Sequence, residues 1–253
     1  MLEVKNVSKS YRSNTVLTDV SFHLEQGECL GLIGESGSGK STIAKLILAL
    51  DRSDSGQIIV NNVDFSQLKG RELRKARRHV QVVFQDPSAS LNPKLPVWKS
   101  VIEPLENYPE ASPSFLKEVR NEKRKMAEIL FEKAGLQSGL LDRYPHQLSG
   151  GQRQRVAIAR GISLQPNLLI FDEPTSNLDV SIQAQILNLL KDLKSEINMS
   201  YLFISHDIAT VQYISERIAV LKEGRLVDLF KTKDLFSADR HPYTKELIDA
   251  ALE

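Results

Sequence analysis

The sequence has little of the material that builds disulfide frameworks, metal clusters or membrane spans. It contains one cysteine, Cys29, in 253 residues, which excludes an intramolecular disulfide and a cysteine-rich metal site. Cys29 begins the apolar run 29–33, so we expect a buried structural thiol. No stretch approaches the roughly 18 uninterrupted apolar residues of a membrane span, because the run 43–50 is short and Lys45 breaks it.

An excess of charge of one sign is absent too. The formal net charge is +1, so no strong global field draws the chain to nucleic acid. Hydrophobic residues make up 41% and charged residues 26%, which is ordinary for a soluble globular protein. The first residues lack the basic start and the apolar stretch of a secretory signal. We therefore expect a cytoplasmic protein that inserts no segment into a membrane and reaches one only through a partner.

Two hydrophobic periods divide the chain. Alternating apolar residues and turn residues predict an antiparallel β region near the N-terminus, and short apolar runs suit buried parallel strands further on. The antiparallel segments are 2–7, 16–25 and 57–60, and the buried runs are 29–33, 80–84, 168–171 and 201–204. Residues 182–197 place apolar side chains at helical spacing, which predicts an amphipathic crossover helix. The pattern is that of an α/β protein.

Residues 90–160 differ in character, with several prolines and no strand pattern. One charged amphipathic helix is predicted there, with Leu116, Val119, Met126 and Leu130 on one stripe. We predict an inserted α-helical subdomain over about 90–160, within an α/β core formed by about 1–89 and 161–253. The basic cluster 71–78 contains Leu73 and Ala76, which favours a solvated helix face over an anion site.

Residues 34–41, Gly-Glu-Ser-Gly-Ser-Gly-Lys-Ser, fit the phosphate-loop pattern. Glycines allow the backbone to curl so that successive N–H groups point at phosphates, Lys40 adds a mobile positive charge, and the Ser41 hydroxyl can ligate Mg²⁺. A glycine-rich turn is the alternative, but the position between an apolar strand and a helix disfavours it. Asp172 and Glu173 directly follow the run 168–171. Such a pair is, taken alone, more often a helix cap.

The segment 148–155, Leu-Ser-Gly-Gly-Gln-Arg-Gln-Arg, narrows the class of phosphate-loop proteins to which the chain can belong. With the phosphate loop it resembles the ATP-binding cassette (ABC) ATPases, whose subunits power membrane transporters. The resemblance covers almost the whole chain, because the other family motifs occur in order, including Pro-Thr-Ser-Asn-Leu-Asp at 174–179. It implies a phosphate-loop NTPase core with an N-terminal antiparallel β subdomain and a helical subdomain. It also implies ATP hydrolysis coupled to transport, with ATP and Mg²⁺ bound.

The resemblance assigns roles residue by residue. It implies Glu173 as general base, His206 as the switch histidine at the γ-phosphate, and Gln85 as a water and Mg²⁺ ligand. The implied metal ligands are Ser41, Gln85 and Asp172. The implied nucleotide-binding residues are Tyr11, Gly34, Glu35, Ser36, Gly37, Ser38, Gly39, Lys40, Ser41, Thr42, Ser149, Gly150, Gly151, Gln152 and Asp179. Tyr11 matches the adenine-stacking aromatic, although packing on a neighbouring strand remains an alternative.

Ser149 and the glycine amides after it match residues that cap the γ-phosphate held by the opposite subunit. Asp179 matches the D-loop aspartate, which links the two nucleotide sites of a dimer. Asn177 stands where many relatives carry alanine. Arg153 and Arg155 are expected to have solvated or structural roles. The implied partners are a second ABC ATPase subunit, identical or different, two membrane permease subunits and an extracytoplasmic binding protein. The expected location is peripheral, at the cytoplasmic face of the membrane.

Residues 86–93, after Gln85, and His241-Pro242-Tyr243-Thr244 resemble importers of the oligopeptide, dipeptide and nickel branch. The chain ends soon after Thr244 and lacks the cysteine cluster of some peptide relatives. This favours nickel or metal-chelate importers, with peptides left open. The proline-rich stretch 92–98 is a candidate groove for a coupling helix of the permease. A non-transport ABC ATPase acting on ribosomes or DNA is the alternative function.

Overall fold

The computed structural model describes residues 1–252, without the side chains of Ala89 and Leu252; Glu253 lies outside the described residues. The chain forms two compact units, each described by itself: Met1–Arg77 with Ser200–Glu253, and Arg78–Met199. The subdomain limits predicted at about 90 and 160 are not tested by this division and stay a prediction. Among the described residues, no helix combines the length and the hydropathy needed to cross a membrane.

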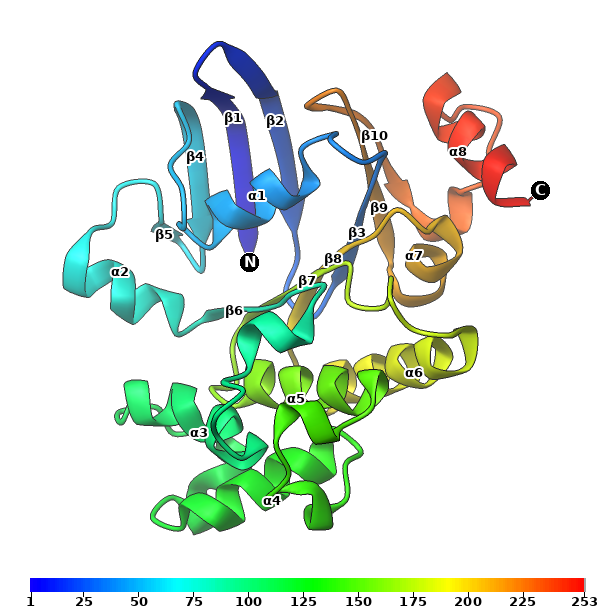
Figure 1. Ribbon diagram of the computed structural model, residues 1–253. Coiled ribbons are helices and arrows are strands. Elements are labelled where there is room, and N and C mark those ends of the chain that lie inside the picture. The colour runs from blue at the N-terminus through cyan, green and yellow to red at the C-terminus, as the bar shows by residue number, and fades with distance from the viewer. Residues whose placement is uncertain (253) are drawn as a thin grey trace. The chain divides into compact units, whose positions relative to one another are not determined.

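The N-terminal part of the first unit is an antiparallel sheet of four strands in the order β2-β1-β4-β5 (Figure 1). Its strands are β1 (Leu2–Tyr11), β2 (Asn14–Leu24), β4 (Ser55–Val60) and β5 (Val63–Asp64). β1, β2 and β4 confirm the predicted antiparallel region, with ends that differ from the predicted segments by one to four residues, and β5 was not predicted. Burial alternates along β2, which has Val20, Phe22 and Leu24 inside. One face of the strand therefore contributes to the core.

Four further strands of the first unit run β10-β9-β3-β8. They are β3 (Cys29–Ile33), β8 (Ser200–Ile204), β9 (Arg217–Lys222) and β10 (Arg225–Lys231). β3 pairs in parallel with both β8 and β9, and every residue of β3 and β8 is buried. The predictions of parallel strands at 29–33 and 201–204 and of a buried Cys29 are confirmed.

The hydrophobic periods did not predict β9 and β10. The sequence signal for this hairpin is Gly224 in the pair Glu223-Gly224. In the structure both residues have positive φ, 47° and 75°. Two such residues between antiparallel strands suit the two-residue turn that matches strand twist. β10 pairs antiparallel with β9.

The helices of the first unit are α1 (Lys40–Ile47), α2 (Gly70–Arg77), α7 (Ile208–Ile214) and α8 (Pro242–Leu252), with a 3₁₀ turn at Thr232–Asp234. α2 has no buried residue, so the expectation of a solvated basic face is confirmed for this helix. Arg77 at its end donates to the carbonyl oxygens of Leu48 and Ala49, which ties the helix to the chain after α1.

The second unit contains the parallel pair β6 (Val80–Val83) and β7 (Leu168–Asp172). Its helices are α3 (Val97–Asn107), α4 (Lys123–Lys133), α5 (Gly150–Ile162) and α6 (Val180–Ile197). Its 3₁₀ turns are Pro87–Ser90, Ser114–Val119, Ser138–Leu140 and Pro145–Gln147. α6 confirms the predicted crossover helix. Between 90 and 160 the described residues form helices and turns without a strand.

The single helix predicted around Leu116–Leu130 is wrong. The chain forms a 3₁₀ helix at Ser114–Val119, turns at 120–122, and begins α4 at Lys123. Leu116 and Leu130 are nonetheless both buried. A tighter first segment and a turn place both side chains in the core without continuous helical spacing. Tertiary packing therefore decided the break.

Candidate functional site

The loop between β3 and α1 is tightly packed at two of its glycines. A Cβ on Gly34 would lie 2.1 Å from the Leu221 carbonyl oxygen, and one on Gly39 would lie 2.6 Å from Leu17 Cδ2. Both residues have positive φ, 152° and 106°, which favours glycine. Gly39 is the N-cap of α1 and supplies no side-chain acceptor. The N-terminus of a helix is a favourable position for an anion such as a phosphate.

Lys40 lies over this loop. Its side chain is buried, with 5% of the residue exposed, and Nζ donates to the carbonyl oxygens of Gly34 at 2.7 Å and Glu35 at 2.8 Å. The Ser38 hydroxyl is buried without a hydrogen-bond partner among the described residues. A buried donor of this kind costs free energy unless a ligand or water satisfies it. The ammonium, the hydroxyl and the helix N-terminus together fit a phosphate group.

His206 emerges at the same edge of the sheet as the phosphate loop. Ile204 of β8 pairs with Leu32 of β3, and the Ser205 N–H donates to the Leu32 carbonyl at 3.2 Å. Asp207 caps α7 by accepting from the Ala209 N–H at 2.9 Å. Both neighbours of His206 are thus fixed, and its exposed imidazole lies at the carboxyl end of β8, where ligands of α/β sheets bind.

Tyr11 ends β1 with its hydroxyl fixed and its ring accessible. The hydroxyl donates to Asp51 Oδ2 at 2.6 Å, and Lys9 Nζ lies 4.9 Å from the ring centroid. The hydrogen bond to Asp51 raises the pKa of Tyr11, and the same bond lowers the pKa of Asp51. With 42% of the residue exposed, Tyr11 offers a flat surface on which a base can stack.

In the second unit, polar residues follow the carboxyl ends of β6 and β7. These ends are adjacent, because Val83 pairs with Phe171. The Gln85 amide donates to Ser176 Oγ at 3.2 Å, and that hydroxyl donates to the Glu173 carbonyl at 3.2 Å. The structure therefore brings Gln85 close to the segment after β7.

Glu173 has an unusual backbone conformation, with φ at 51°. The left-handed region disfavours residues with a side chain, and such strain concentrates at functional sites. Asp172 and Glu173 are half-buried. Among the described residues, no cluster of three or more His, Cys, Asp or Glu side chains forms a metal site.

Ser149 begins α5 with a reciprocal cap. Its hydroxyl accepts from the Gln152 N–H at 3.2 Å, and Gln152 Oε1 accepts from the Ser149 N–H at 3.0 Å. A Cβ on Gly151 would lie 2.6 Å from Ile182 Cγ2, so α5 and α6 approach too closely there for a side chain. The segment is thus a rigid helix start whose free amides can face an anion.

Arg153 and Arg155 have structural roles, as expected. Arg153 donates to the Leu148 carbonyl at 2.6 Å, and Arg155 donates to the Ala134 carbonyl at 3.0 Å. Burial lowers the pKa of the Arg155 guanidinium. Asp179 is the N-cap of α6 and accepts from the Ile182 N–H at 2.9 Å. The next residue, Val180, is 83% exposed, which leaves an apolar side chain in water beside this cap.

One contact of the phosphate loop was not predicted. The Glu35 N–H donates to the Tyr243 hydroxyl at 3.1 Å, across 208 positions of sequence. The His-Pro-Tyr-Thr segment that contains Tyr243 was interpreted only as a marker of the transporter branch. That segment was the available signal, but the contact itself depends on the fold of the first unit.

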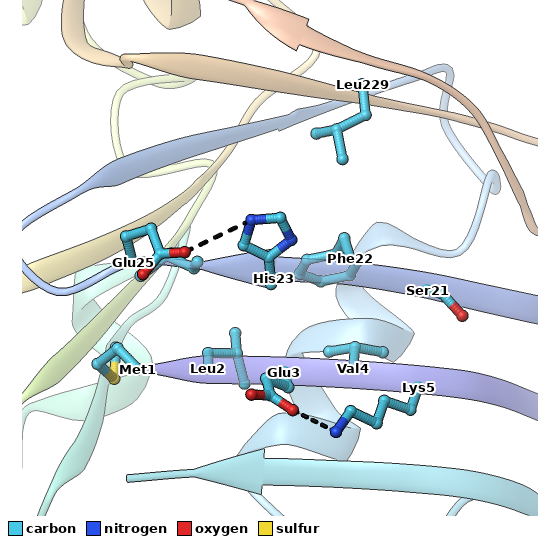
Figure 2. A pocket seen from close by; sticks show the side chains of 11 residues that line it. Met1, Leu2, Glu3, Val4, Lys5, Ser21, Phe22, His23, Glu25 and Leu229 are labelled. Atoms are coloured by element: carbon cyan, nitrogen blue, oxygen red, sulfur yellow. Dashed lines mark ion pairs between the residues drawn. The ribbon is translucent and has the colours of Figure 1, made fainter.

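A hollow elsewhere on the first unit is lined by β1, β2 and Leu229 of β10 (Figure 2). It encloses about 460 Å³. Figure 2 shows that polar side chains in it contact one another: Glu3 pairs with Lys5, and Glu25 lies 3.6 Å from the His23 imidazole. Because these side chains already contact one another, we assign the hollow no part in the chemistry.

Comparisons with known proteins identify the family. The family model described as "ABC transporter" matches residues 17–176, more than half of the chain. The chain is 44% identical to the "Probable peptide ABC transporter ATP-binding protein y4tS" of Sinorhizobium fredii, over 99% of this chain and 72% of that protein. It is 42% identical to the "Oligopeptide transport ATP-binding protein OppF" of Streptococcus mutans, over 100% of this chain and 82% of that protein.

A solved structure is similar throughout. It is described as the dimeric, post-hydrolysis state of the ATP-binding cassette MJ0796 bound to ADP and Pi. The TM-score is 0.80 at 34% identity, covering 92% of this chain and 99% of that one. The predicted fold class is thereby confirmed.

Proposed function

The chain belongs to the ABC transporter family of ATP-hydrolysing cassettes, and we propose that it is the ATPase subunit of an importer of peptides. The observation that carries this proposal is the similarity over nearly the whole chain to proteins named for peptide transport. The segments 86–93 and His241–Thr244, which resemble the same transporter branch, also support it. A function on ribosomes or DNA has no comparable support.

Within the first unit, we propose that the loop 34–39 and the first turn of α1 hold the phosphates of ATP. The glycines at positive φ, the unpartnered Ser38 hydroxyl and the buried Lys40 ammonium support this assignment. Lys40 would exchange its carbonyl contacts for phosphate oxygens, which are stronger acceptors. Tyr11 would stack on the adenine, and His206 would contact the γ-phosphate.

Within the second unit, Glu173 is the proposed general base that polarises the attacking water. Gln85 would orient the same water, supported by its contact with Ser176 in the segment after β7. Gln85 and Asp172 are the proposed Mg²⁺ ligands of this unit, and Ser41 is the proposed Mg²⁺ ligand of the first unit, as the family resemblance implies. When bound, Mg²⁺ supplies positive charge that offsets the negative charge on the phosphate oxygens.

We propose that the active form pairs two cassettes, with Ser149, Gly150, Gly151 and Gln152 of one chain capping the nucleotide of the other. The capped helix start at Ser149 supplies amides for an anion, and the exposed Val180 beside Asp179 supplies apolar surface for a partner. The dimeric MJ0796 structure supports the same association. The second cassette is either another copy or a related chain.

Two permease subunits and an extracytoplasmic binding protein complete the proposed importer, with this chain peripheral at the cytoplasmic face. A cavity of about 480 Å³ beside α3, lined by Asn92, Leu95 and Trp98 among others, is the proposed seat for a permease helix. Peptides are the first proposed cargo, because the named relatives are peptide transporters. Nickel or another metal chelate is the second.

The test compares uptake of labelled di- and oligopeptides and of radioactive nickel in cells with and without the gene for this chain. Peptide uptake should fall in its absence and return with the wild-type chain, but not with Glu173→Gln. The matched control is Glu110→Gln, which changes an exposed glutamate and should restore uptake. If only nickel uptake is lost, the proposed cargo becomes the metal chelate in place of peptides. If neither uptake is lost, the importer assignment is refuted.

A further inference from the structure

The His-Pro-Tyr-Thr segment at the start of α8 is fixed to β10 through one carboxylate. Asp228 Oδ2 accepts from the His241 N–H at 2.9 Å and from the Thr244 hydroxyl at 3.0 Å. Asp228 Oδ1 accepts from Arg240 at 3.3 Å. Thr244 is completely buried. One side chain of β10 therefore sets where α8 begins and how its first turn is oriented.

The same first turn places Tyr243 against the phosphate loop. Tyr243 is buried, with 3% of the residue exposed, and its ring centroid lies 4.4 Å from Lys222 Nζ at the end of β9. Its hydroxyl accepts from the Glu35 N–H at 3.1 Å. Burial raises the pKa of this hydroxyl; the Glu35 amide opposes the rise, and the Glu35 carboxylate adds to it. The hydroxyl stays neutral around pH 7 and can keep accepting from the amide.

Glu35, whose amide binds Tyr243, also binds Lys40 of the phosphate loop. The Glu35 carbonyl accepts from Lys40 Nζ at 2.8 Å, while the Glu35 N–H is bound to Tyr243. Glu35 is thus fixed at both polar groups of its backbone, by α8 on one side and by α1 on the other. The direction of its amide depends on a residue 208 positions away in the sequence.

We propose that Tyr243 is a positioning residue of the phosphate loop: through the Glu35 amide it preorganises the loop for the nucleotide phosphates. Preorganisation lowers the conformational cost of binding. The His-Pro-Tyr-Thr segment would therefore support ATP binding from outside the loop. This inference rests on the proposed ATP site.

The expected size of the effect follows mainly from the hydrogen bond with the Glu35 amide, although Tyr243→Phe also removes the interaction of the hydroxyl with the Glu35 carboxylate. Removing a neutral hydrogen bond typically changes an equilibrium constant about 2- to 10-fold. The contact is part-buried, so water replaces the hydroxyl in part, and the lower part of that range applies. Tyr243→Phe keeps the ring and its contact with Lys222 and removes only the hydroxyl. We expect the Kd of ATP to rise about 3-fold.

The experiment measures ATP binding by the full chain with Tyr243→Phe, and with Tyr213→Phe as the matched control on the exposed part of α7. Thermal unfolding without nucleotide checks the fold of each variant. Tyr243→Phe should raise the Kd about 3-fold with an unfolding temperature near that of the wild type, and Tyr213→Phe should leave the Kd unchanged. In steady-state hydrolysis, KM should rise while kcat changes less than twofold.

Failure of the inference differs from failure of the proposed function. If the wild-type chain binds no ATP, the proposed site is wrong. If the wild type binds ATP and Tyr243→Phe binds it equally well, Tyr243 does not position the loop. A higher Kd accompanied by a clearly lower unfolding temperature, or an equal rise in Tyr213→Phe, would also overturn the inference, because loss of general stability would then explain the effect.

Discussion

Two adjacent glycines at the start of α5 should respond to alanine in opposite directions. A Cβ on Gly150 would meet Leu178 Cδ2 at 3.6 Å, an ordinary van der Waals contact, whereas a Cβ on Gly151 would meet Ile182 Cγ2 at 2.6 Å. Both positions gain helix propensity from alanine, up to about 1 kcal/mol in a helix interior and less at this terminus. Only Gly151→Ala also introduces a steric overlap.

The overlap decides whether Gly151→Ala raises or lowers the free energy of unfolding. Ile182 is β-branched and stiff at χ1, so its Cγ2 cannot turn aside without moving the helix or leaving its rotamer. Overpacking of this kind costs about 1–3 kcal/mol. After subtraction of the propensity gain, Gly151→Ala should lower the free energy of unfolding by about 1–2 kcal/mol. Gly150→Ala should raise it by about 0.5 kcal/mol or leave it unchanged.

Urea unfolding of the nucleotide-free chain measures the difference, compared by transition midpoints because the chain has two compact units. The rescue variant is Ile182→Ala, which removes the overlapping methyl group. In the Ile182→Ala background, Gly151→Ala should no longer destabilise, giving a coupling energy of about 1 kcal/mol or more. Equal effects of the two glycine variants, or no rescue by Ile182→Ala, would show that helix contact does not require Gly151.

The other predictions concern chemistry, assembly and pH. Glu173→Gln should retain ATP while turnover falls about 10²-fold or more, and Lys40→Ala should weaken ATP binding itself; near-normal turnover in Glu173→Gln would remove its role as base. In a mixed dimer, Ser149→Arg on one chain should block hydrolysis of the partner's ATP, and a block confined to the mutated chain's own ATP would contradict capping in trans. The Tyr11 hydroxyl and Lys9 hold the pKa of Asp51 below its ordinary value, so the stability from this contact is present above about pH 4 and is lost as pH falls through the lowered pKa. Asp51→Asn should accordingly make acid unfolding less steep, and an unchanged acid transition would show that the contact adds nothing.

The sequence predicts those parts of the proposed site whose signals are local. The strand 29–33, the glycine loop and the helix after it follow one another directly, and a tight curl of backbone needs glycine whatever surrounds it. The sequence predicts functional carboxylates at the end of one buried strand and a functional histidine after another, because ligand-binding side chains of α/β proteins follow the carboxyl ends of parallel strands. The segments 86–93 and His241–Thr244, however, do not predict which residues they contact.

The sequence by itself determined the buried parallel strands, the phosphate loop, the crossover helix α6 and the family. These depend on periodicity and on residue types at fixed spacing, which the linear order preserves. Only the tertiary structure decided that the helix predicted near residue 120 is broken, that Gly151 contacts Ile182, and that Tyr243 binds the Glu35 amide. The two contacts depend on close approach between segments distant in sequence, and no local pattern encodes a distance of that kind.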